Sequence, residues 1–543
     1  MQHKTISFGE IPHQSKLFLD FQANSADLNK FYPEKHTNLI DYAEKVLANY
    51  KTNRRELCDV LEETNKFFDA GEKTFENIKL LRDETSVAIV TGQQAGLFSG
   101  ELYTIYKALS AVRLAEDLRG QNIKAVPVFW IAEEDHDFDE VKKTFVIDRE
   151  GKLAKLENTP ENYLESLPVG LVKLDETINQ TIEDLFESLP HSEFSGETKS
   201  LLNQTYRKNE TYSTAFAKFL TKIFSRYGLI FLSPLNEKLK KLCAPIFVET
   251  VEKSDEIISA LLEKNEELRE DNYKAQILVA ENSFSFFFQD ESGKRLALRR
   301  DLENSKFKIQ NSKVKFDKAE LIEIARNTPH NLSPNALLRP VVQDYLLPTL
   351  AYFGGAAEIA YFAQNSAIYK ILNRPATPIR HRASFTVVQR KYARTLEKYA
   401  LEFSKLFAGE EKILAEIVEK FIANETAETF AEVEEIVNAQ LNRLDESLTK
   451  IEPTLSANLA NRGKKIIWHI GALRKKYHLA EIRKNEILRQ RIENLFTALL
   501  PNNALQERTL NVTVFLNLFG TNFIDWIYEA IKTDEEEHKI LYL

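Results

Sequence analysis

Apolar positions follow a helical period over the N-terminal region and then change to a strand-like run. Residues 13–83 place apolar side chains three or four positions apart, and Leu39, Tyr42 and Val46 are one such set. This spacing predicts amphipathic helices. Residues 87–90 form instead a short continuous apolar run, which is typical of a strand buried on both faces of a parallel sheet.

A second apolar run follows the first after one helical segment. Residues 102–118 return to helical spacing, Gly120 marks a helix end, and residues 125–132 (AVPVFWIA) are the second strand candidate. The order strand, helix, strand predicts a right-handed βαβ unit. Because ligands bind beyond the carboxyl ends of parallel strands, we expect the functional residues to follow these two runs.

Glycine, amide and hydroxyl residues follow the first predicted strand. The sequence TGQQAGLFSGE at residues 91–101 lacks the lysine of a P-loop and the spacing of a dinucleotide fingerprint. Its glycines let a ligand approach the backbone, and its glutamine amides can donate and accept hydrogen bonds. The alternative is a tight turn with solvated glutamines. The candidate binding residues in this segment are Gly92, Gln93, Gln94, Gly96, Ser99 and Tyr103.

An acidic run with one histidine, EEDHD at residues 133–137, follows the second predicted strand. Its carboxylates could bind a divalent cation, or could raise the pKa of His136 so that it serves as a general acid or base. The alternative is a solvated helix N-terminus, and the position after a buried strand favours function. The predicted catalytic residues are Asp135, His136 and Asp137, with Glu134 as a candidate binding residue.

Residues 145–325 change character and are predicted to be material inserted into the sheet. Short alternating segments, ending with VGLVKL at residues 169–174, indicate an antiparallel subdomain. A strand candidate at residues 229–234 and a long helix over residues 237–270 follow. Two strand-like runs around residues 290–293 (DESG) predict a β-hairpin.

Residues 331–382 return to the parallel sheet. The segment LPTLAYFGG at residues 347–355 predicts a strand that ends at two glycines, and TPIRHRASF at residues 377–385 is a last strand candidate. Arg339 can bind a carboxylate or phosphate through two parallel hydrogen bonds, with an interdomain salt bridge as the alternative. The candidate binding residues of this region are Arg339, Gln343, Asp344, Gly354, Gly355, Glu358, Tyr361 and Ser384.

Beyond residue 385 glycine becomes rare and a heptad pattern begins. Leu441, Leu444 and Leu448 follow the alternating three-and-four spacing of a coiled-coil seam, and residues 466–477 repeat it. Pro453 lies between the two stretches, so we expect an antiparallel helical hairpin, with one kinked helix as the alternative. The arm either pairs with a second subunit or packs only on itself, and we expect a homodimer.

Composition narrows the class of protein. The 543 residues carry a formal net charge of -9, so no overall basic field favours nucleic acid as a partner. The two cysteines, Cys58 and Cys243, lie outside any metal-binding spacing, which predicts a reduced cytoplasmic protein without structural zinc. No apolar run reaches the roughly 20 residues that span a bilayer, and no signal peptide is expected.

The predicted fold class is α/β, with a parallel core, inserted subdomains and a helical arm. The chain is too long for one hydrophobic core. Its predicted parts are an N-terminal helical region (1–84), the first half of the core (85–144), inserted subdomains (145–325), the second half of the core (326–384), a coiled-coil arm (385–500) and a C-terminal segment that packs on the body (501–543).

Three long motifs, followed by the coiled-coil region, resemble one family. The motifs are TGQQAGLFSGELYTIYKA, VPVFWIAEEDHDFDEV and LRPVVQDYLLPTLAYFGGAAEIAYFAQ. In this order they resemble the bacillithiol biosynthesis cysteine-adding enzyme family, the cysteine ligases, over nearly the whole chain. The resemblance implies a Rossmann-like core with inserted subdomains similar to the connective peptides of class I aminoacyl-tRNA synthetases, and an arm used in dimerisation. It also implies an activity, the joining of cysteine to glucosaminyl-malate to give bacillithiol.

The implied chemistry needs an activated carboxylate, because a free carboxylate does not acylate an amine at neutral pH. ATP is the expected co-substrate, through an acyl phosphate or an adenylate, with Mg²⁺ as a candidate metal; no KMSKS-like loop is visible in the sequence. We expect the N–H groups of residues 92–96 and the next helix N-terminus to hold an anionic group. We expect His136 near the reacting carboxyl group, and Arg339 and Glu358 at the malate carboxylate and amine groups.

Two other functions stay open from the sequence. One is a nucleotidyl- or aminoacyl-transferase that uses a preactivated donor. The other is a non-enzymatic assembly protein, in which the core binds a metabolite and the arm recruits a partner. Polar residues at several strand ends argue against a pure scaffold, because a scaffold needs none there.

Overall fold

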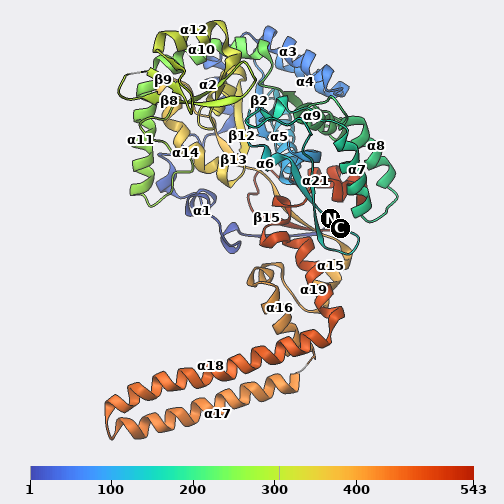
Figure 1. Ribbon diagram of the computed structural model, residues 1–543, viewed down its shortest axis with the longest axis vertical. Helices are drawn as coiled ribbons and strands as arrows, with labels where there is room; N and C mark the ends of the chain where they lie inside the picture. Colours follow the sequence, from blue (N-terminus) through green and yellow to red (C-terminus); the bar gives the residue numbers. More distant parts are fainter. Residues whose placement is uncertain (1, 305, 423) are drawn as a thin grey trace. The chain divides into compact units, whose positions relative to one another are not determined.

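The computed structural model of the protein describes residues 2–304, 306–422 and 424–543 (Figure 1). The chain divides into two compact units. The core unit comprises Thr5–Thr386 and Glu507–Lys539, and the arm unit comprises Met1–Lys4, Val387–Gln506 and Ile540–Leu543. Each unit is therefore assembled from segments that are distant in the sequence.

A five-stranded parallel sheet forms the centre of the core unit. Its strands in sheet order are β13 (Ile379–His381), β12 (Thr349–Gly354), β2 (Val87–Gln93), β3 (Ala125–Ile131) and β6 (Ile230–Leu232). The chain starts in the middle at β2, adds β3 and β6 on one side, and then crosses to add β12 and β13 on the other. This order confirms the Rossmann-like prediction and places the topological switch point between β2 and β12.

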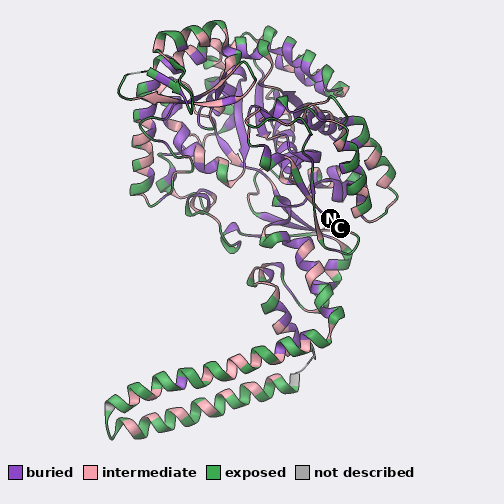
Figure 2. Ribbon diagram, viewed as in Figure 1, coloured by how far each residue is buried: buried purple, intermediate pink, exposed green. Residues whose placement is uncertain are grey.

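Helices packed on this sheet explain its continuous apolar runs. All side chains of β3, and those of β2 up to its last residue, are buried (Figure 2). One cluster of buried side chains joins β2, β3 and β12 to α2 (Leu39–Asn49) and α5 (Tyr103–Gly120). Two further helices, α3 (Arg54–Phe67) and α4 (Glu72–Leu81), lie against β6 and β3. The N-terminal helices and the first βαβ unit are thus confirmed.

The inserted part of the core unit lies between β3 and β12 in the sequence and contains helices and two antiparallel sheets. Its helices are α6 (Phe138–Val141), α7 (Thr177–Ser188), α8 (Ser195–Thr205), α9 (Tyr212–Ile223), α10 (Glu237–Glu252), α11 (Ser254–Glu270) and α12 (Lys318–Asn327). Its two-stranded sheet pairs β4 (Lys143–Ile147) with β5 (Leu153–Glu157). Its five-stranded sheet has the order β10 (Lys315–Phe316), β9 (Lys306–Ile309), β8 (Arg295–Asp301), β7 (Phe286–Gln289), β11 (Leu332–Pro334). The hairpin predicted at residues 290–293 is the turn between β7 and β8, where Gly293 has a φ of 84°.

Two predicted elements of the insertion are wrong. The single helix expected over residues 237–270 is two helices, because Lys253 leaves the helical region with φ -95° and ψ 15°. The strand expected at VGLVKL contains a short 3₁₀ turn, Val169–Leu171. The N–H groups of Val169 and Gly170 donate to backbone carbonyls of the acidic run after β3, at 2.7 and 2.9 Å, so they are not available to a strand partner.

The last predicted core strand, residues 377–385, is also wrong as a single strand. It is divided between β13 in the central sheet and β14 (Ser384–Val388), which belongs to a three-stranded sheet with β1 (Gln2–Ile6) and β15 (His538–Tyr542). Arg382 and Ala383 separate the two strands, and the N–H of Arg382 donates to the carbonyl of Gly354 at 3.0 Å. The chain therefore leaves the parallel sheet directly beside the carboxyl end of β12.

The remaining helices of the core unit are one near the N-terminus, two that flank β12 in the sequence and two near the C-terminus. They are α1 (Lys16–Gln22), α13 (Arg339–Leu346), α14 (Ala356–Ile371), α20 (Thr513–Phe519) and α21 (Asn522–Ala530). Helix α21 packs on α5, and the hydroxyl of Thr533 donates to Asp117 at 2.8 Å. The C-terminal segment thus contacts the helix that follows β2.

The arm unit contains the helical hairpin predicted from the heptads. Helices α17 (Asn424–Thr449) and α18 (Pro453–Lys484) run side by side and are joined by a short turn (Figure 1). Pro453 is the first residue of α18, where its fixed φ and missing N–H are tolerated, so the hairpin is confirmed and the kinked helix is wrong. The other helices of this unit are α15 (Arg390–Lys398), α16 (Glu410–Ile417) and α19 (Glu486–Leu499). Among the helices described, none is long and apolar enough to cross a membrane.

Candidate functional site

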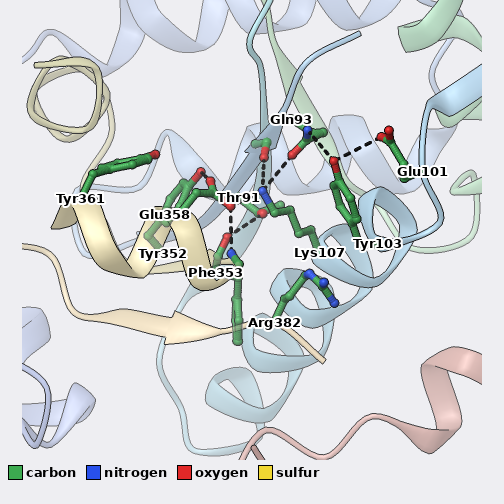
Figure 3. Close-up of polar contacts among 12 residues, drawn as sticks. Thr91, Gln93, Glu101, Tyr103, Lys107, Tyr352, Phe353, Glu358, Tyr361 and Arg382 are labelled. Carbon is green, nitrogen blue, oxygen red and sulfur yellow. Dashed lines mark hydrogen bonds and ion pairs between the residues drawn. The ribbon is translucent and has the colours of Figure 1, made fainter. Parts of the chain in front are cut away.

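A buried lysine occupies the topological switch point of the sheet. Lys107 of α5 donates to the carbonyl of Gly92 at 3.0 Å and to Oε1 of Gln93 at 2.9 Å, both at the end of β2. It also forms an ion pair with Glu358 of α14, which follows β12 (Figure 3). Only 3% of the Lys107 side chain is exposed. One ammonium group therefore connects the carboxyl ends of β2 and β12.

Glu358 is held on its other side by groups from β12 and the following turn. The hydroxyl of Tyr352 donates to Oε1 at 2.6 Å, and the N–H of Gly355 donates to Oε2 at 2.8 Å. Burial raises the pKa of Glu358, but Lys107 and these donors outweigh burial, and the pKa lies below its ordinary value. Glu358 is therefore an ionised carboxylate fixed in place, and its predicted contact with a substrate amine requires a ligand that reaches this pair.

The contacts of Lys107 continue along the loop after β2. The amide of Gln93 donates to the hydroxyl of Tyr103 at 3.3 Å, and that hydroxyl donates to Glu101 at 3.1 Å (Figure 3). Burial raises the pKa of Glu101 above its ordinary value. The guanidinium of Arg382 lies over the Tyr103 ring, 5.2 Å from its centroid. Two predicted binding residues, Gln93 and Tyr103, thus belong to one polar network with Glu358.

The loop after β2 has an unusual backbone that the C-terminal segment holds in place. Phe98, Ser99 and Gly100 have positive φ angles of 53°, 88° and 68°. Non-glycine residues adopt this region at an energetic cost, and it persists where surrounding contacts enforce it. The amide of Asn511 donates to the carbonyls of Leu97, Phe98 and Gly100 at 3.3, 3.0 and 2.8 Å. A residue near the end of the chain therefore fixes the shape of this loop.

The glycines at this edge are needed for close packing of the backbone. A Cβ atom on Gly92 would lie 2.7 Å from the carbonyl oxygen of Trp130, and one on Gly96 would lie 2.7 Å from Cα of Gly100. Both distances are shorter than real Cβ contacts. The tight-turn alternative therefore accounts for these two glycines without a ligand.

The anion cradle expected at residues 92–96 and the start of α5 has fewer open donors than expected, because hydrogen bonds within the protein use some of its N–H groups. The N–H of Gly96 donates to the carbonyl of Gln94 at 2.9 Å, and the N–H of Leu102 donates to the carbonyl of Leu510 at 2.9 Å. Ser99 donates its N–H to the hydroxyl of Tyr206 at 3.2 Å. These three donors are already used within the protein and are not open to an anion; for the other N–H groups of residues 92–96 the cradle stays a prediction.

A cavity of about 410 Å³ lies beyond the end of β3, between the central sheet and the inserted five-stranded sheet. Three arginines line it, Arg295 and Arg299 from β8 and Arg339 from α13. Aromatic side chains form much of the remaining wall, namely Trp130, Phe284, Phe286 and Phe287. His136, Asp135 and Glu134 line the same cavity. The arginines give it a positive wall suited to carboxylate or phosphate groups.

Arg339 faces this cavity and joins it to the switch point. Its guanidinium donates to Oε1 of Gln343 at 3.0 Å and to the hydroxyl of Tyr361 at 3.1 Å. It lies 5.4 Å from the centroid of the Tyr352 ring, and Tyr352 in turn donates to Glu358. The salt-bridge alternative has no support, because within the described residues no carboxylate lies within ion-pair distance of Arg339.

The carboxylates of the acidic run point to different partners. Glu133 accepts hydrogen bonds from the hydroxyl of Ser233 and, at 3.1 Å, from the N–H of Leu235. Glu134 forms a buried ion pair with Lys240. Among residues 2–304, 306–422 and 424–543, no three or more histidine, cysteine, aspartate or glutamate side chains form a group that could hold a metal ion. The carboxylates of Glu133 and Glu134 are thus engaged by other groups, and the acidic run forms no such cluster among the described residues.

The remaining residues of this run lie at the cavity and at its edge. Asp135 accepts a hydrogen bond from the amide of Gln94 at 2.7 Å, which connects the ends of β2 and β3. Asp137 is exposed, and its N–H donates to Asp135 at 3.3 Å. The structure thus brings Gln94, Asp135 and His136 together, while Asp137 lies outside the cavity wall.

His136 has an environment opposite to the one expected. The Nη1 atom of Arg295 lies 3.1 Å from its Nδ1 atom, and Asp135 Oδ1 lies 3.9 Å from the same nitrogen. Burial and the Arg295 charge together lower the pKa of His136 below its ordinary value, outweighing the two aspartates. The expectation that the acidic run raises this pKa is therefore wrong, because the imidazole is partly buried and the insertion places a cation beside it.

The predicted binding residue Asp344 lies in a buried network of its own. Asp344 accepts hydrogen bonds from the hydroxyls of Tyr369 and Thr377 and, at 3.0 Å, from the amide of Gln343. It precedes β12, at the amino end of that strand, and burial raises its pKa. The predicted site lies at the carboxyl ends of the strands, so Asp344 is not part of it. Its hydrogen bonds stabilise the opposite end of β12 instead.

Ser384 belongs to a buried network that includes a charged pair. Arg382 and Glu507 form an ion pair of 2.7 Å, and the hydroxyl of Ser384 donates to the same glutamate oxygen at 2.7 Å. Ser384 Oγ also lies 2.7 Å from Nδ1 of His538. Burial lowers the pKa of His538 to about 4, although Glu507 opposes this. Ser384 therefore shares Glu507 with Arg382, whose guanidinium lies over the Tyr103 ring, and it does not line the cavity.

Three residues of the site were not predicted from the sequence. Lys107 had a detectable signal, since it is the only charged residue in residues 103–112, an otherwise apolar and hydroxyl-rich helix segment. Arg295 and Asn511 carried none, because their contacts come from segments far from β2 and β3 in the sequence.

Comparison with known proteins covers almost the whole chain. The family profile described as "Bacillithiol biosynthesis BshC, N-terminal Rossmann-like domain" matches residues 1–383, and the one described as "Bacillithiol biosynthesis BshC, C-terminal coiled-coil domain" matches residues 385–543. The chain is 33% identical over 538 residues to the "Putative cysteine ligase BshC" of Koribacter versatilis, covering 99% of each chain. It is 31% identical over 528 residues to the protein of the same name in Salinibacter ruber, covering 97% of this chain and 96% of that one.

A solved structure also aligns with the chain. The crystal structure titled as a "putative arginyl t-RNA synthetase" from Campylobacter jejuni covers 84% of this chain and 100% of that chain, with 9% sequence identity and a TM-score of 0.24. The family profiles and the relatives of BshC extend over both the Rossmann-like and the coiled-coil parts described above. The chain therefore belongs to the BshC family of bacillithiol biosynthesis.

Proposed function

We propose that this protein is a ligase that joins cysteine to glucosaminyl-malate by an amide bond. The observation that carries the proposal is the cavity beyond β3, where Arg295, Arg299 and Arg339 form a positive wall and His136 lies at the rim. A malate group carries two carboxylates, which guanidinium groups bind through charge-assisted hydrogen bonds. Membership of the BshC family, whose relatives are named as cysteine ligases, supports the choice of cysteine.

ATP is the proposed co-substrate, with Mg²⁺ accompanying it. The cysteine carboxylate attacks a phosphorus atom of ATP and forms an acyl phosphate or an adenylate, with ADP or pyrophosphate as the leaving group. The glucosamine amine then attacks the acyl carbon, a proton leaves the nitrogen, and phosphate or AMP departs. Arginines of the cavity suit the phosphate charge, and the residues around Lys107 and Glu358 keep the strand ends in position.

The two cysteines support a reducing location. Cys58 and Cys243 are both free and buried. Proteins that keep free thiols and form no disulfides are typical of the cytoplasm. We therefore place the proposed reaction in the cytoplasm.

Formation of the amide product by the purified protein tests the ligase proposal. We expect product, measured by mass spectrometry, from cysteine, glucosaminyl-malate, ATP and Mg²⁺, with ATP consumed in equal amount. Omitting ATP is expected to stop the reaction, and a preformed cysteinyl adenylate is the comparison donor. Product from the preformed donor alone, with none from ATP, would show a transferase instead. No product with either donor would refute the proposed function.

A homodimer through the helical hairpin is the second part of the proposal. Helix α17 carries seven acidic and one basic side chain, whereas α18 carries eight basic and one acidic. Exposed apolar side chains remain on the hairpin, including Ile451, Trp468 (67% exposed) and Leu473. A two-fold axis brings the acidic helix of one copy against the basic helix of the other, and the apolar side chains become buried between them.

Light scattering after size-exclusion chromatography tests this dimer. The wild-type protein is expected to be a dimer, and the double variant Trp468→Ser, Leu473→Ser is expected to be a monomer, because two apolar contacts at the centre of the hairpin are lost. Ile487→Ser is the matched control, since Ile487 is more exposed than Trp468 and Leu473 but belongs to α19 outside the hairpin. A monomeric wild-type protein at 10 µM or above, or a dimeric double variant, contradicts the proposed interface (about 10 µM corresponds to about 7 kcal/mol).

A further inference from the structure

The contact between Arg295 and His136 determines which nitrogen of the imidazole carries the proton. A guanidinium group has only N–H donors, so Nδ1 of His136, 3.1 Å from Nη1 of Arg295, must accept a hydrogen bond. In a neutral imidazole the proton is then on Nε2. Among the described residues, no protein group forms a hydrogen bond with Nε2. His136 is 36% exposed and lines the cavity.

Arg295 is itself held rigidly enough to impose this arrangement. Its Nε donates to the hydroxyl of Ser333 at 2.9 Å, and its Nη2 donates to the carbonyl of Pro334 at 3.1 Å. Its guanidinium lies over the Phe287 ring, 3.6 Å from the centroid. Only 8% of the side chain is exposed. All three nitrogens of the guanidinium group are thus used, and β7 and β11 fix its position.

The geometry points to a division of roles, which rests on the proposed function. Arg295 is a positioning residue that keeps His136 as the Nε2–H tautomer. His136 donates a hydrogen bond to the oxygen of the activated cysteine carbonyl. This oxygen becomes negative when the amine attacks the acyl carbon. A neutral N–H donor already in place stabilises that charge. The imidazole therefore acts as a donor, and the proton of the attacking amine leaves to another acceptor, a carboxylate or water.

The charged groups around His136 are consistent with this role. Asp135 and Asp137 lie on its own loop and Arg295 lies on β8. Asp135 accepts the backbone N–H of His136 at 2.7 Å and not a ring N–H. Burial and Arg295 lower the pKa of His136, which keeps the ring neutral around pH 7. The inserted sheet, through Arg295, thus sets the protonation of a residue that the central sheet positions.

A pair of substitutions at residue 136 distinguishes a donor from a base. The amide nitrogen of glutamine reaches the position of Nε2, whereas the asparagine amide ends near Nδ1. We expect His136→Asn to lower kcat about 100-fold, the effect of losing one donor to a developing oxyanion. His136→Gln is expected to stay well above His136→Asn, because it keeps the donor. Equal losses in the two variants, with unchanged thermal unfolding, would overturn the donor role.

Nitrogen-15 NMR of histidine-labelled protein tests the role of Arg295 without turnover. The His136 signals are assigned by their absence in His136→Gln, and in the wild type we expect the proton on Nε2 and a lone pair on Nδ1. Arg295→Met is expected to give a mixture of tautomers and a lower kcat. Arg299→Met removes another cavity arginine that does not contact His136, and it is expected to leave the tautomer unchanged. A proton on Nδ1 in the wild type, or an unchanged tautomer in Arg295→Met, overturns the assignment.

The two proposals fail in different ways. If the wild-type protein forms no amide product with any donor, the proposed function is wrong, and the tautomer measurement still decides whether Arg295 fixes the imidazole. If product forms and the tautomer is Nδ1–H, the ligase proposal stands and the division of roles is wrong.

Discussion

Replacing Lys107 with methionine is expected to lower the free energy of unfolding by about 3–5 kcal/mol, the range measured when one partner of a buried ion pair is removed. The Glu358 carboxylate then stays in the interior without its ammonium partner, and the carbonyl of Gly92 and the amide of Gln93 lose a donor. Turnover is expected to fall as well, because no ammonium group then connects the ends of β2 and β12. Urea unfolding followed by tryptophan fluorescence measures the stability.

Two further variants show whether charge is the cause. The double variant Lys107→Met, Glu358→Gln is expected to lose less stability than Lys107→Met alone, since no unpaired charge remains. Lys124→Met removes a lysine from an exposed pair with Asp83 and is expected to change stability by less than about 1 kcal/mol. If Lys107→Met behaves like Lys124→Met, the switch-point lysine does not hold the two strand ends together.

Acid is expected to destabilise the protein through His538. Its pKa in the folded state is about 4, against an ordinary value of 6.5, because burial disfavours the charged ring. Between these two values the unfolded chain binds a proton that the folded chain does not, so stability rises with pH and is lost as pH falls. This one group is expected to remove about 2 kcal/mol between pH 7 and pH 5. Burial also lowers the pKa of His381, which adds to the loss.

Unfolding in urea at pH 7 and pH 5 checks this prediction. His538→Gln is expected to be less stable than the wild type at pH 7, because Ser384 and Thr386 lose their ring partner, but to lose about 2 kcal/mol less on going to pH 5. His191→Gln is the control, since His191 is exposed. The prediction is wrong if His538→Gln and the wild type show the same dependence on pH.

The sheet could be predicted because its strands are short apolar runs. The runs at 87–90 and 125–132 correspond to β2 and β3, and Gly120 is the last residue of α5. These features depend on neighbours in the sequence, which hydrophobic periodicity reports. The turn at Val169 depends on hydrogen bonds to the distant residues 133 and 135, and periodicity does not report those.

The site could be predicted only in part for the same reason. Strand-end logic identified Gln94, Asp135 and His136, and the bidentate donor geometry of arginine identified Arg339. The structure joins Gln94 to Asp135 and places Asp135, His136 and Arg339 at one cavity. The protonation of His136 could not be predicted, because Arg295 lies 159 residues further along the chain. The acidic run alone suggested a raised pKa. Burial of the imidazole, together with the Arg295 charge from the inserted sheet, lowers the pKa instead.

The three hydrogen bonds of Asn511 have a consequence for how the chain folds while it is being translated. Asn511 follows Gly100 by 411 residues, and its amide is the donor for three carbonyls of the strained loop after β2. A nascent chain can pair β2 with β3 long before this asparagine leaves the ribosome. The loop then receives its final shape only near the end of synthesis. The three hydrogen bonds that hold this loop therefore form late in synthesis, and a chain that terminates before residue 511 lacks all of them.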